Sequence, residues 1–195
     1  MVGNVDGYIP KTINAALQIL NSENVIVYAG GTDLMVRYKN ETSLLPKFDK
    51  NILYIGQIDE LKKVYENSEE IVIGAGCTLA SLLRNEHVPE ILKKSIRGAA
   101  SPAIRNMGTI GGNICNASPA GDTLPVLYSL NSRCNVISEG LERTINIEDF
   151  IYGPRRTALK KNEILKSITI SKENFNIVHY EKVGARKASA ISKLS

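Results

Sequence analysis

Two glycine-rich segments contain the residue types most suited to binding a ligand. The first covers residues 29–34 (Ala-Gly-Gly-Thr-Asp-Leu) and directly follows an apolar run. Paired glycines turn the chain tightly and let a ligand approach the backbone without a Cβ in the way. The N–H groups exposed in such a turn form an anion-binding nest suited to a pyrophosphate, and the Thr32 hydroxyl adds a donor. For Gly-Gly alone, a plain turn between a strand and a loop is the alternative interpretation.

The second segment covers residues 108–122 and combines four glycines with small polar residues. A loop this long and this poor in bulky side chains is usually functional, so we expect a second ligand-binding loop here. Cys115 lies inside the segment, where it could be a reactive thiol. Free cysteines are usually small buried residues, and this interpretation is favoured.

Motifs for unaided bond chemistry are missing from the sequence. Gly74 and Gly76 begin a GxGxxG pattern, but Leu79 takes the place of its third glycine, and no P-loop occurs. His87 and His179 have no Cys or His neighbours at metal-ligand spacing. No GxSxG elbow is present either. We therefore assign no catalytic residue and no metal site, and we expect a bound cofactor to carry the chemistry.

The elements that would position these segments follow from apolar periodicity and turn signals. We expect helices at 13–20, with Thr12 as N-cap, at 79–83, at 89–99 and shortly after Asp122. The run at 25–29 is continuously apolar, which is typical of a buried strand. Further strands are expected at 52–55, 63–65, 71–73, 133–137, 142–147, 164–170 and 176–183. The pattern predicts a mixed α/β chain of the α+β class, with a break near residues 56–60.

Composition excludes several classes of protein. The chain has 195 residues, which suffice for one domain of average size or two small lobes sharing a site. The net charge of +4 comes from scattered basic residues, and this argues against a nucleic-acid interface. No window approaches the roughly 18 apolar residues of a membrane helix, and the N-terminus carries no secretory signal. Three separated cysteines form no disulfide framework, so we expect a cytoplasmic protein.

The two segments resemble the two flavin-binding motifs of the FAD-binding subunits of molybdenum hydroxylases, the xanthine dehydrogenase and carbon monoxide dehydrogenase family. Residues 12–20, 73–79, 150–165 and 182–188 also look like segments of this family, in the same order. The resemblance implies a two-lobed FAD-binding fold of the molybdopterin dehydrogenase or CO dehydrogenase flavoprotein type. It implies a small βαβ lobe at 1–57, a larger α+β lobe at 58–183 and the start of a shortened C-terminal domain at 184–195.

The resemblance also implies a set of cofactor contacts, with FAD extended between the lobes and its pyrophosphate on backbone amides of both loops. Asp122 matches a carboxylate that contacts the cofactor, and it could also cap the helix that it precedes. The cofactor-binding residues expected in this way are Val27, Tyr28, Ala29, Gly30, Gly31, Thr32, Asp33, Leu34, Ala99, Ala100, Thr109, Ile110, Gly111, Gly112, Asn113, Asp122, Leu165 and Lys182.

The function implied is that of an oxidoreductase subunit in a heteromeric complex resembling xanthine dehydrogenase. The implied partners are a molybdopterin-binding subunit and a 2Fe-2S subunit, from which FAD collects electrons before a hydride passes to NAD⁺. One alternative is a truncated assembly module or remnant that no longer binds flavin. Another is an FAD oxidase using O₂, with Cys115 as the loop candidate for covalent attachment. The substrate stays open among purines, carbon monoxide and aromatic acids.

Overall fold

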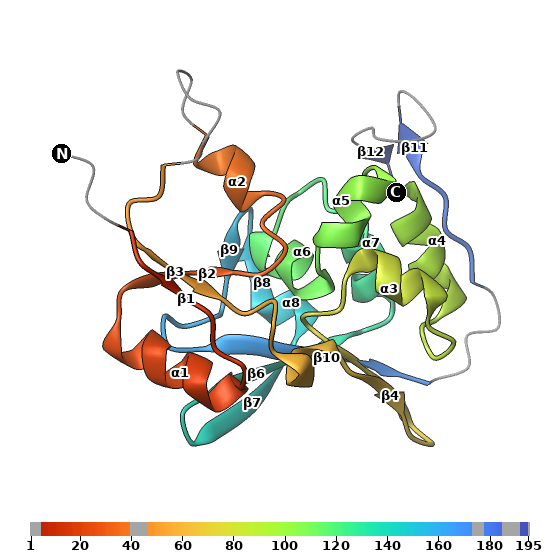
Figure 1. Cartoon of the computed structure of the whole chain (residues 1–195). Helices are drawn as coiled ribbons and strands as arrows, with labels where there is room; N and C mark the ends of the chain where they lie inside the picture. Colours follow the sequence, from red (N-terminus) through yellow and green to blue (C-terminus); the bar gives the residue numbers. More distant parts are fainter. Residues whose placement is uncertain (1–4, 40–46, 173–177, 185–191, 195) are drawn as a thin grey trace.

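The computed structural model describes residues 5–39, 47–172, 178–184 and 192–194. A small parallel sheet of three strands forms one part of it, in the order β1-β3-β2. The strands are β1 (Gly7–Tyr8), β2 (Val25–Tyr28) and β3 (Asn51–Tyr54). The expected first helix is confirmed as α1 (Ile13–Ser22), which lies below this sheet in Figure 1. Thr12 caps it, because its Oγ1 accepts a hydrogen bond from the Ala15 N–H at 3.2 Å.

The strand expected at 25–29 is present, but it is half-buried throughout rather than buried. Val25 and Val27 pack against the core beneath the sheet. Ile26 and Val27 also line the large cavity described below. The continuous apolar run therefore reflects a strand that packs on a core and borders a cavity.

An antiparallel sheet of five strands forms the second part, in the order β4-β5-β10-β6-β7. Its strands are β4 (Val64–Glu66), β5 (Glu70–Gly74), β6 (Arg133–Ser138), β7 (Leu141–Asn146) and β10 (Ile164–Ser171). The strands expected at 133–137 and 142–147 are confirmed as the antiparallel pair β6 and β7, with Gly140 at a φ of +73° in the turn between them. The central strand β10 is almost entirely buried, as a strand between two neighbours and under helices must be.

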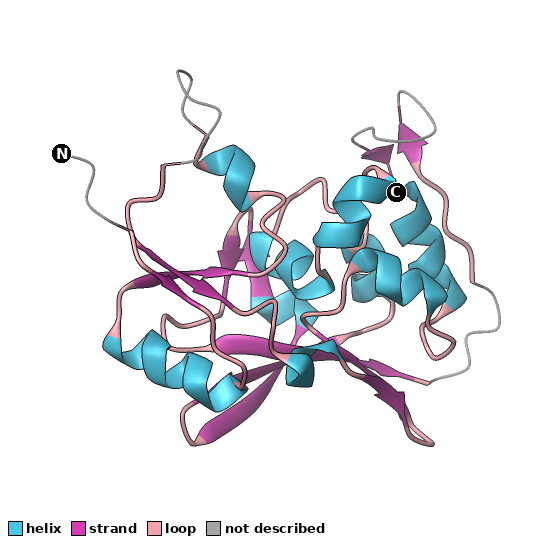
Figure 2. Cartoon of the chain, viewed as in Figure 1, coloured by secondary structure: helices cyan, strands magenta, loops and turns pink. Residues whose placement is uncertain are grey.

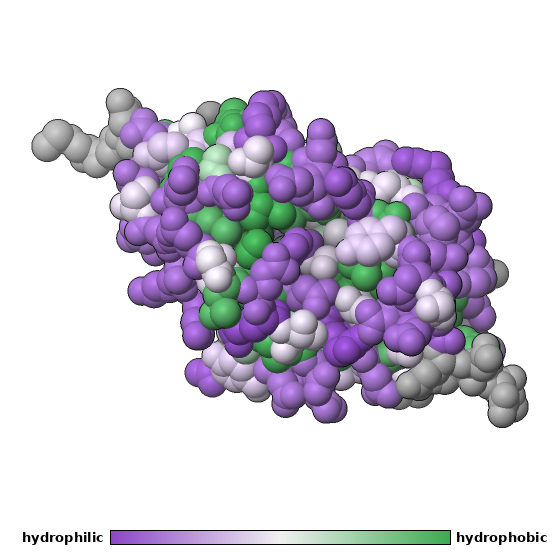
Figure 3. Space-filling view, turned by 90° about the horizontal axis from the view of Figure 1, so that it is seen from below, coloured by the Kyte–Doolittle hydropathy of each residue, from purple (hydrophilic) through white to green (hydrophobic). Residues whose placement is uncertain are grey.

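Short helices lie above this sheet in Figure 2 and cover the larger hydrophobic core. They are α3 (Leu79–Arg84), α4 (Glu90–Gly98), α5 (Pro102–Met107), α6 (Ile110–Asn116), α7 (Leu124–Ser129) and α8 (Ile147–Phe150). The expected helices at 79–83 and 89–99 are confirmed. The opposite face of the molecule, seen from below in Figure 3, is covered mostly by hydrophilic side chains.

Residues 110–116 of the second glycine-rich segment form the helix α6 where a loop was expected, whereas residues 117–122 form turns and irregular structure. Thr109 is the N-cap of α6, and its Oγ1 accepts a hydrogen bond from the Gly112 N–H at 3.0 Å. Glycine disfavours helix by about 1 kcal/mol per residue relative to alanine, so local propensity gave no sign of this helix. Its buried residues Ile110 and Ile114 belong to the larger core, and tertiary packing therefore stabilises it.

The remaining elements are short: α2 (Leu34–Arg37), the 3₁₀ turn η1 (Asp59–Lys62), β8 (Ile151–Gly153), β9 (Arg156–Thr157), β11 (Val183–Gly184) and β12 (Ser192–Leu194). The strand expected at 176–183 is wrong for residues 178–182, which form no regular element, while 176 and 177 lie outside the described residues. The division between lobes at residues 57 and 58 falls between β3 and β4 and stays a prediction. Most of 184–195 lies outside the described ranges. No helix among the described residues is long and apolar enough to span a bilayer.

Candidate functional site

A cavity of about 480 Å³ opens where the two glycine-rich segments meet. Its volume is in the range of small-molecule and cofactor sites. Its walls come from residues 26–37 at the end of β2, from 99–122 across α5 and α6, and from 159–165 at the start of β10. The fold therefore brings together segments separated by more than a hundred residues in sequence.

Most of the residues expected from the sequence to bind a cofactor line this cavity, and three do not. Tyr28 packs its ring against Tyr54, with ring centroids 5.7 Å apart. Ile110 is fully buried in the larger core. Lys182 does not line the cavity itself but forms an ion pair with Asp122, which does. Those that line the cavity are Val27, Ala29, Gly30, Gly31, Thr32, Asp33, Leu34, Ala99, Ala100, Thr109, Gly111, Gly112, Asn113, Asp122 and Leu165.

The first glycine-rich turn presents a run of unused backbone donors. Among the described residues, the N–H groups of residues 30–34 have no hydrogen-bond acceptor, and all of these residues line the cavity. The turn is held from its other side, because the Met35 N–H donates to the Gly31 carbonyl at 2.9 Å. Gly31 has a φ of +70°, in the left-handed region that favours glycine. Successive backbone amides that point the same way in a turn form an anion-binding nest, so this run is suited to an anionic ligand.

The second glycine-rich segment differs, because its helix already uses the corresponding donors. The N–H groups of Ile110 and Gly111 donate to the carbonyls of Cys77 and Ala75, at 3.0 and 2.9 Å. Those of Gly112 and Asn113 donate to the Thr109 hydroxyl and carbonyl, both at 3.0 Å. Backbone donors for an anion therefore come chiefly from the first turn, whereas α6 supplies a wall of small residues.

Two glycines of these segments allow close backbone packing, and a third leaves open space at the cavity. A Cβ on Gly30 would lie 2.0 Å from the carbonyl oxygen of Met107, at the end of α5. A Cβ on Gly111 would lie 2.6 Å from the Ala75 Cβ and 2.7 Å from its carbonyl oxygen. Gly112 is different, since its Cβ would meet only the Thr109 hydroxyl, at 2.9 Å. Gly30 and Gly111 thus seat the two segments against their neighbours.

Asp122 and Lys182 form a largely buried ion pair at one end of the cavity. Their Oδ1 and Nζ atoms are 2.8 Å apart, and Lys182 Nζ also donates to the Gly98 carbonyl at 3.0 Å. The pair ties the 178–184 segment to the end of α4. Burial, with a contribution from the charge of Asp122, raises the pKa of Tyr180 beside it. The expected capping role of Asp122 is wrong, because Thr123 occupies the N-cap position of α7 and Asp122 precedes it.

Arg37, Asn116 and Asp33 form a polar network that joins the two segments at the rim of the cavity. Arg37 Nη2 donates to Asn116 Oδ1 at 2.8 Å, and Asn116 Nδ2 donates to Asp33 Oδ2 at 2.9 Å. All three residues line the cavity. Sequence reasoning did not find Arg37 or Asn116. The spacing of Asp33 and Arg37, four residues apart, is the one signal that could have paired them on a helical turn.

Glu163 is a cavity-lining carboxylate that the sequence did not mark, and it is fully engaged by its neighbours. Arg143 donates to it through Nε and Nη2, both at 2.8 Å, and the Lys160 N–H donates at 2.7 Å. The hydrogen bonds from Arg143 hold the pKa of Glu163 below its usual value, against the opposing effect of burial. We therefore interpret Glu163 as a residue that stabilises the cavity wall through these hydrogen bonds.

Cys115 lines the cavity, but its chemistry is that of an inert thiol. Burial raises the pKa of Cys115 to about 12, so the nucleophilic thiolate is scarce at neutral pH. The remaining lining residues are four from the second glycine-rich segment and seven from neighbouring elements. They are Ile26, Ile55, Ala75, Leu79, Ile104, Gly108, Ser118, Ala120, Gly121, Leu159 and Ile164.

Comparison with known proteins gives consistent similarities over most of the chain. Residues 3–172 match the family described as the FAD binding domain in molybdopterin dehydrogenase. The nicotinate dehydrogenase FAD-subunit of Eubacterium barkeri is 28% identical over 197 residues, covering 95% of this chain and 64% of that protein. Xanthine dehydrogenase/oxidase of Gallus gallus is 32% identical over 184 residues, covering 84% of this chain and 13% of that protein.

A solved structure supports the same fold. Reconstituted CO dehydrogenase from Oligotropha carboxidovorans superimposes with a TM-score of 0.83 at 25% identity. The superposition covers 98% of this chain and 68% of that one. The chain spans less than two thirds of the length of the two curated relatives above.

Proposed function

Because the chain belongs to the family of FAD binding domains in molybdopterin dehydrogenases, we propose that it serves as the FAD-binding subunit of a molybdenum hydroxylase. The two-lobed α+β FAD-binding fold and its cofactor, FAD, follow from membership of this family. The relatives include a protein named as an FAD-subunit, and the proposed class of activity is accordingly that of an oxidoreductase.

The finer parts of the proposal concern the complex. Its partners would be a molybdopterin-binding subunit and a 2Fe-2S subunit, with electrons arriving from the clusters of the latter and leaving as a hydride to NAD⁺. A cytoplasmic location belongs to the same proposal. The wall of the cavity is built from this chain, whereas a substrate pocket would lie on the molybdopterin-binding partner.

The observation that carries the proposal is the run of amides at residues 30–34 along the cavity wall, which meet no hydrogen-bond acceptor in the described part of the chain. These donors fit the two negative charges of a pyrophosphate, because each can give a charge-assisted hydrogen bond. Ala99, Ala100 and Gly112 line the same cavity and leave room for planar rings. FAD, when bound, supplies two-electron redox chemistry that no side chain provides. The task of the chain is then to hold, orient and shield the cofactor.

The test is a titration of the flavin-free chain with FAD, followed by flavin absorption and fluorescence. Gly112→Phe should abolish binding, because its ring fills the cavity while its Cβ meets only the Thr109 hydroxyl. Gly7→Phe is the matched control, since nothing lies within 4 Å of a Cβ at Gly7 and it lies outside the cavity. Circular dichroism and thermal melting check that both variants fold. A folded wild-type chain that binds no FAD would overturn the proposal.

A further inference from the structure

Arg37 is the one positively charged side chain among the described residues that line the cavity. Three carboxylates line it as well: Asp33, Asp122 and Glu163. Lys182 pairs with Asp122 and Arg143 with Glu163, each at 2.8 Å. These two acidic groups are therefore neutralised from outside the cavity. The electrostatic character of the first turn then depends on Asp33 and Arg37.

Asn116 separates these two charges and fixes where the guanidinium lies. Its amide nitrogen faces the Asp33 carboxylate and its amide oxygen faces Arg37, the single orientation in which both bonds form. In the described part of the chain, Asp33 and Arg37 are joined only through Asn116, although Asp33 is the N-cap of α2 and Arg37 is its last residue. Within the described part of the chain, Arg37 uses one of its five N–H donors and has no carboxylate partner. Its charge and its remaining donors are available at the cavity rim.

A dianion bound on the amides of residues 30–34 would lie beside the Asp33 carboxylate, and the two like charges would repel each other. Neutral amides stabilise such an anion but do not cancel that repulsion. A guanidinium held next to the same turn offsets the repulsion with its positive charge, and its planar set of donors suits phosphate oxygens. The Asn116 bond keeps the guanidinium at the rim and away from Asp33.

We propose that Arg37 is a specificity-determining residue of the cavity, whose charge selects flavins that carry a pyrophosphate over those without phosphate. This inference rests on the proposed function, because it presumes that the cavity takes a flavin. If Arg37 has this role, its replacement changes the ratio of the affinities for FAD and riboflavin, and it changes how the FAD affinity responds to salt. A residue that merely supported the fold would change neither.

The experiment measures the dissociation constants of FAD and of riboflavin for the flavin-free wild-type chain and for Arg37→Gln, over a range of ionic strengths. Arg37→Gln should lose about tenfold in FAD affinity, the usual order for one charge-assisted hydrogen bond, and keep its riboflavin affinity. The wild-type FAD affinity should fall as salt screens the charge, and the variant should respond less. Arg37→Lys should recover most of the discrimination, because it restores the charge.

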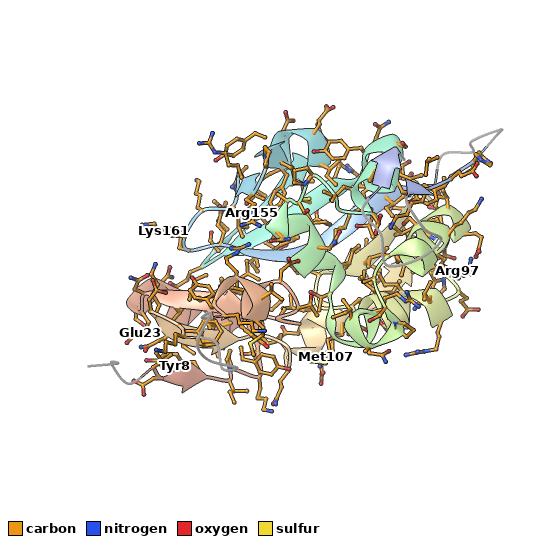
Figure 4. The ribbon with its side chains drawn as sticks, turned by 90° about the horizontal axis from the view of Figure 1, so that it is seen from above. Tyr8, Glu23, Arg97, Met107, Arg155 and Lys161 are labelled. Atoms are coloured by element: carbon orange, nitrogen blue, oxygen red, sulfur yellow. The ribbon has the colours of Figure 1, made fainter. Side chains whose placement is uncertain are left out.

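Arg97→Gln is the matched control. Arg97 pairs with Glu90 on α4, outside the cavity, and Figure 4 shows it at the far end of the molecule from Tyr8 and Glu23. If wild type binds FAD and Arg37→Gln keeps both the FAD-to-riboflavin ratio and the salt response, the inference is wrong while the proposed function stands. If wild type binds neither flavin, the proposed function itself fails.

Discussion

Ile164 and Leu165 are consecutive residues of β10, yet they pack into different hydrophobic cores. Ile164 joins the smaller core with residues of α1 and β3, and Leu165 joins the larger core beneath the helices. Their exposed fractions are 2% and 4%, and both residues also line the cavity. Successive side chains of a strand point to opposite faces. The central strand therefore couples the two cores, and the cavity lies where they meet.

Ile164→Ala should weaken this coupling and lower the free energy of unfolding by about 2–5 kcal/mol, the usual cost of a cavity left by a buried isoleucine. Urea denaturation followed by circular dichroism measures the loss. Leu141→Ala is the control, because Leu141 is 59% exposed and its truncation should change stability by no more than about 0.5 kcal/mol. A similar small loss for both variants would show that the smaller core does not depend on β10.

Local signals were enough to predict the helices and strands that frame the site. Thr12 and Thr78 are N-caps next to periodic apolar residues, and both helices begin where those caps indicate. The helix α6 also begins at a threonine N-cap, Thr109, but the glycines in its first turn lower its helix propensity and favoured the prediction of a loop. Its stability comes from contacts distant in sequence, such as the Gly111 N–H to the Ala75 carbonyl.

In the candidate site, too, some features follow from local sequence and others depend on contacts distant in sequence. The amide donors of residues 30–34 follow from the composition of one short turn, and so the sequence could indicate them. The role of Arg37 depends on Asn116, which lies 79 positions later and is placed by the end of α6. The alternation at 176–183 predicted a strand, but Tyr180 is buried and Val178 is half-exposed within a segment of irregular structure. Periodicity alone could not distinguish a strand from an irregular segment in which buried and exposed side chains alternate.

Gly111→Ala should destabilise the fold without any ligand present. The added Cβ would lie 2.6 Å from the Ala75 Cβ and 2.7 Å from its carbonyl oxygen, so backbone must shift. Overpacking of this kind costs about 1–3 kcal/mol. Adding Ala75→Gly should restore only part of the loss, because the carbonyl oxygen stays in place. Thermal melting compares the variants with Gly7→Ala, whose Cβ meets nothing within 4 Å. A melting temperature equal to wild type would contradict this packing role.

Glu163 should make the stability of the chain sensitive to acid. Hydrogen bonds from Arg143 hold its folded-state pKa below the usual value, despite burial. Its stabilising contribution is therefore complete above the unfolded-state pKa of about 4.3 and is lost as the pH falls through the lower, folded-state pKa. Glu163→Gln should flatten the decline in unfolding free energy in that acidic window, measured by denaturation at several pH values. The exposed Glu148→Gln control should keep the wild-type slope. Parallel profiles for all three proteins would argue against the role of this carboxylate.

The three cysteines should resist alkylation while the chain is folded. Burial is the main cause that raises their pKa values, to about 11 for Cys77 and to about 12 for Cys115 and Cys134. Since the thiolate is the nucleophile, iodoacetamide near pH 8 should add no label to the native chain and three labels in guanidinium, as intact mass will show. Cys115 is the informative residue, because it lines the cavity. Fast labelling at Cys115 alone, located by peptide mapping, would instead favour the interpretation of a reactive thiol beside the cofactor.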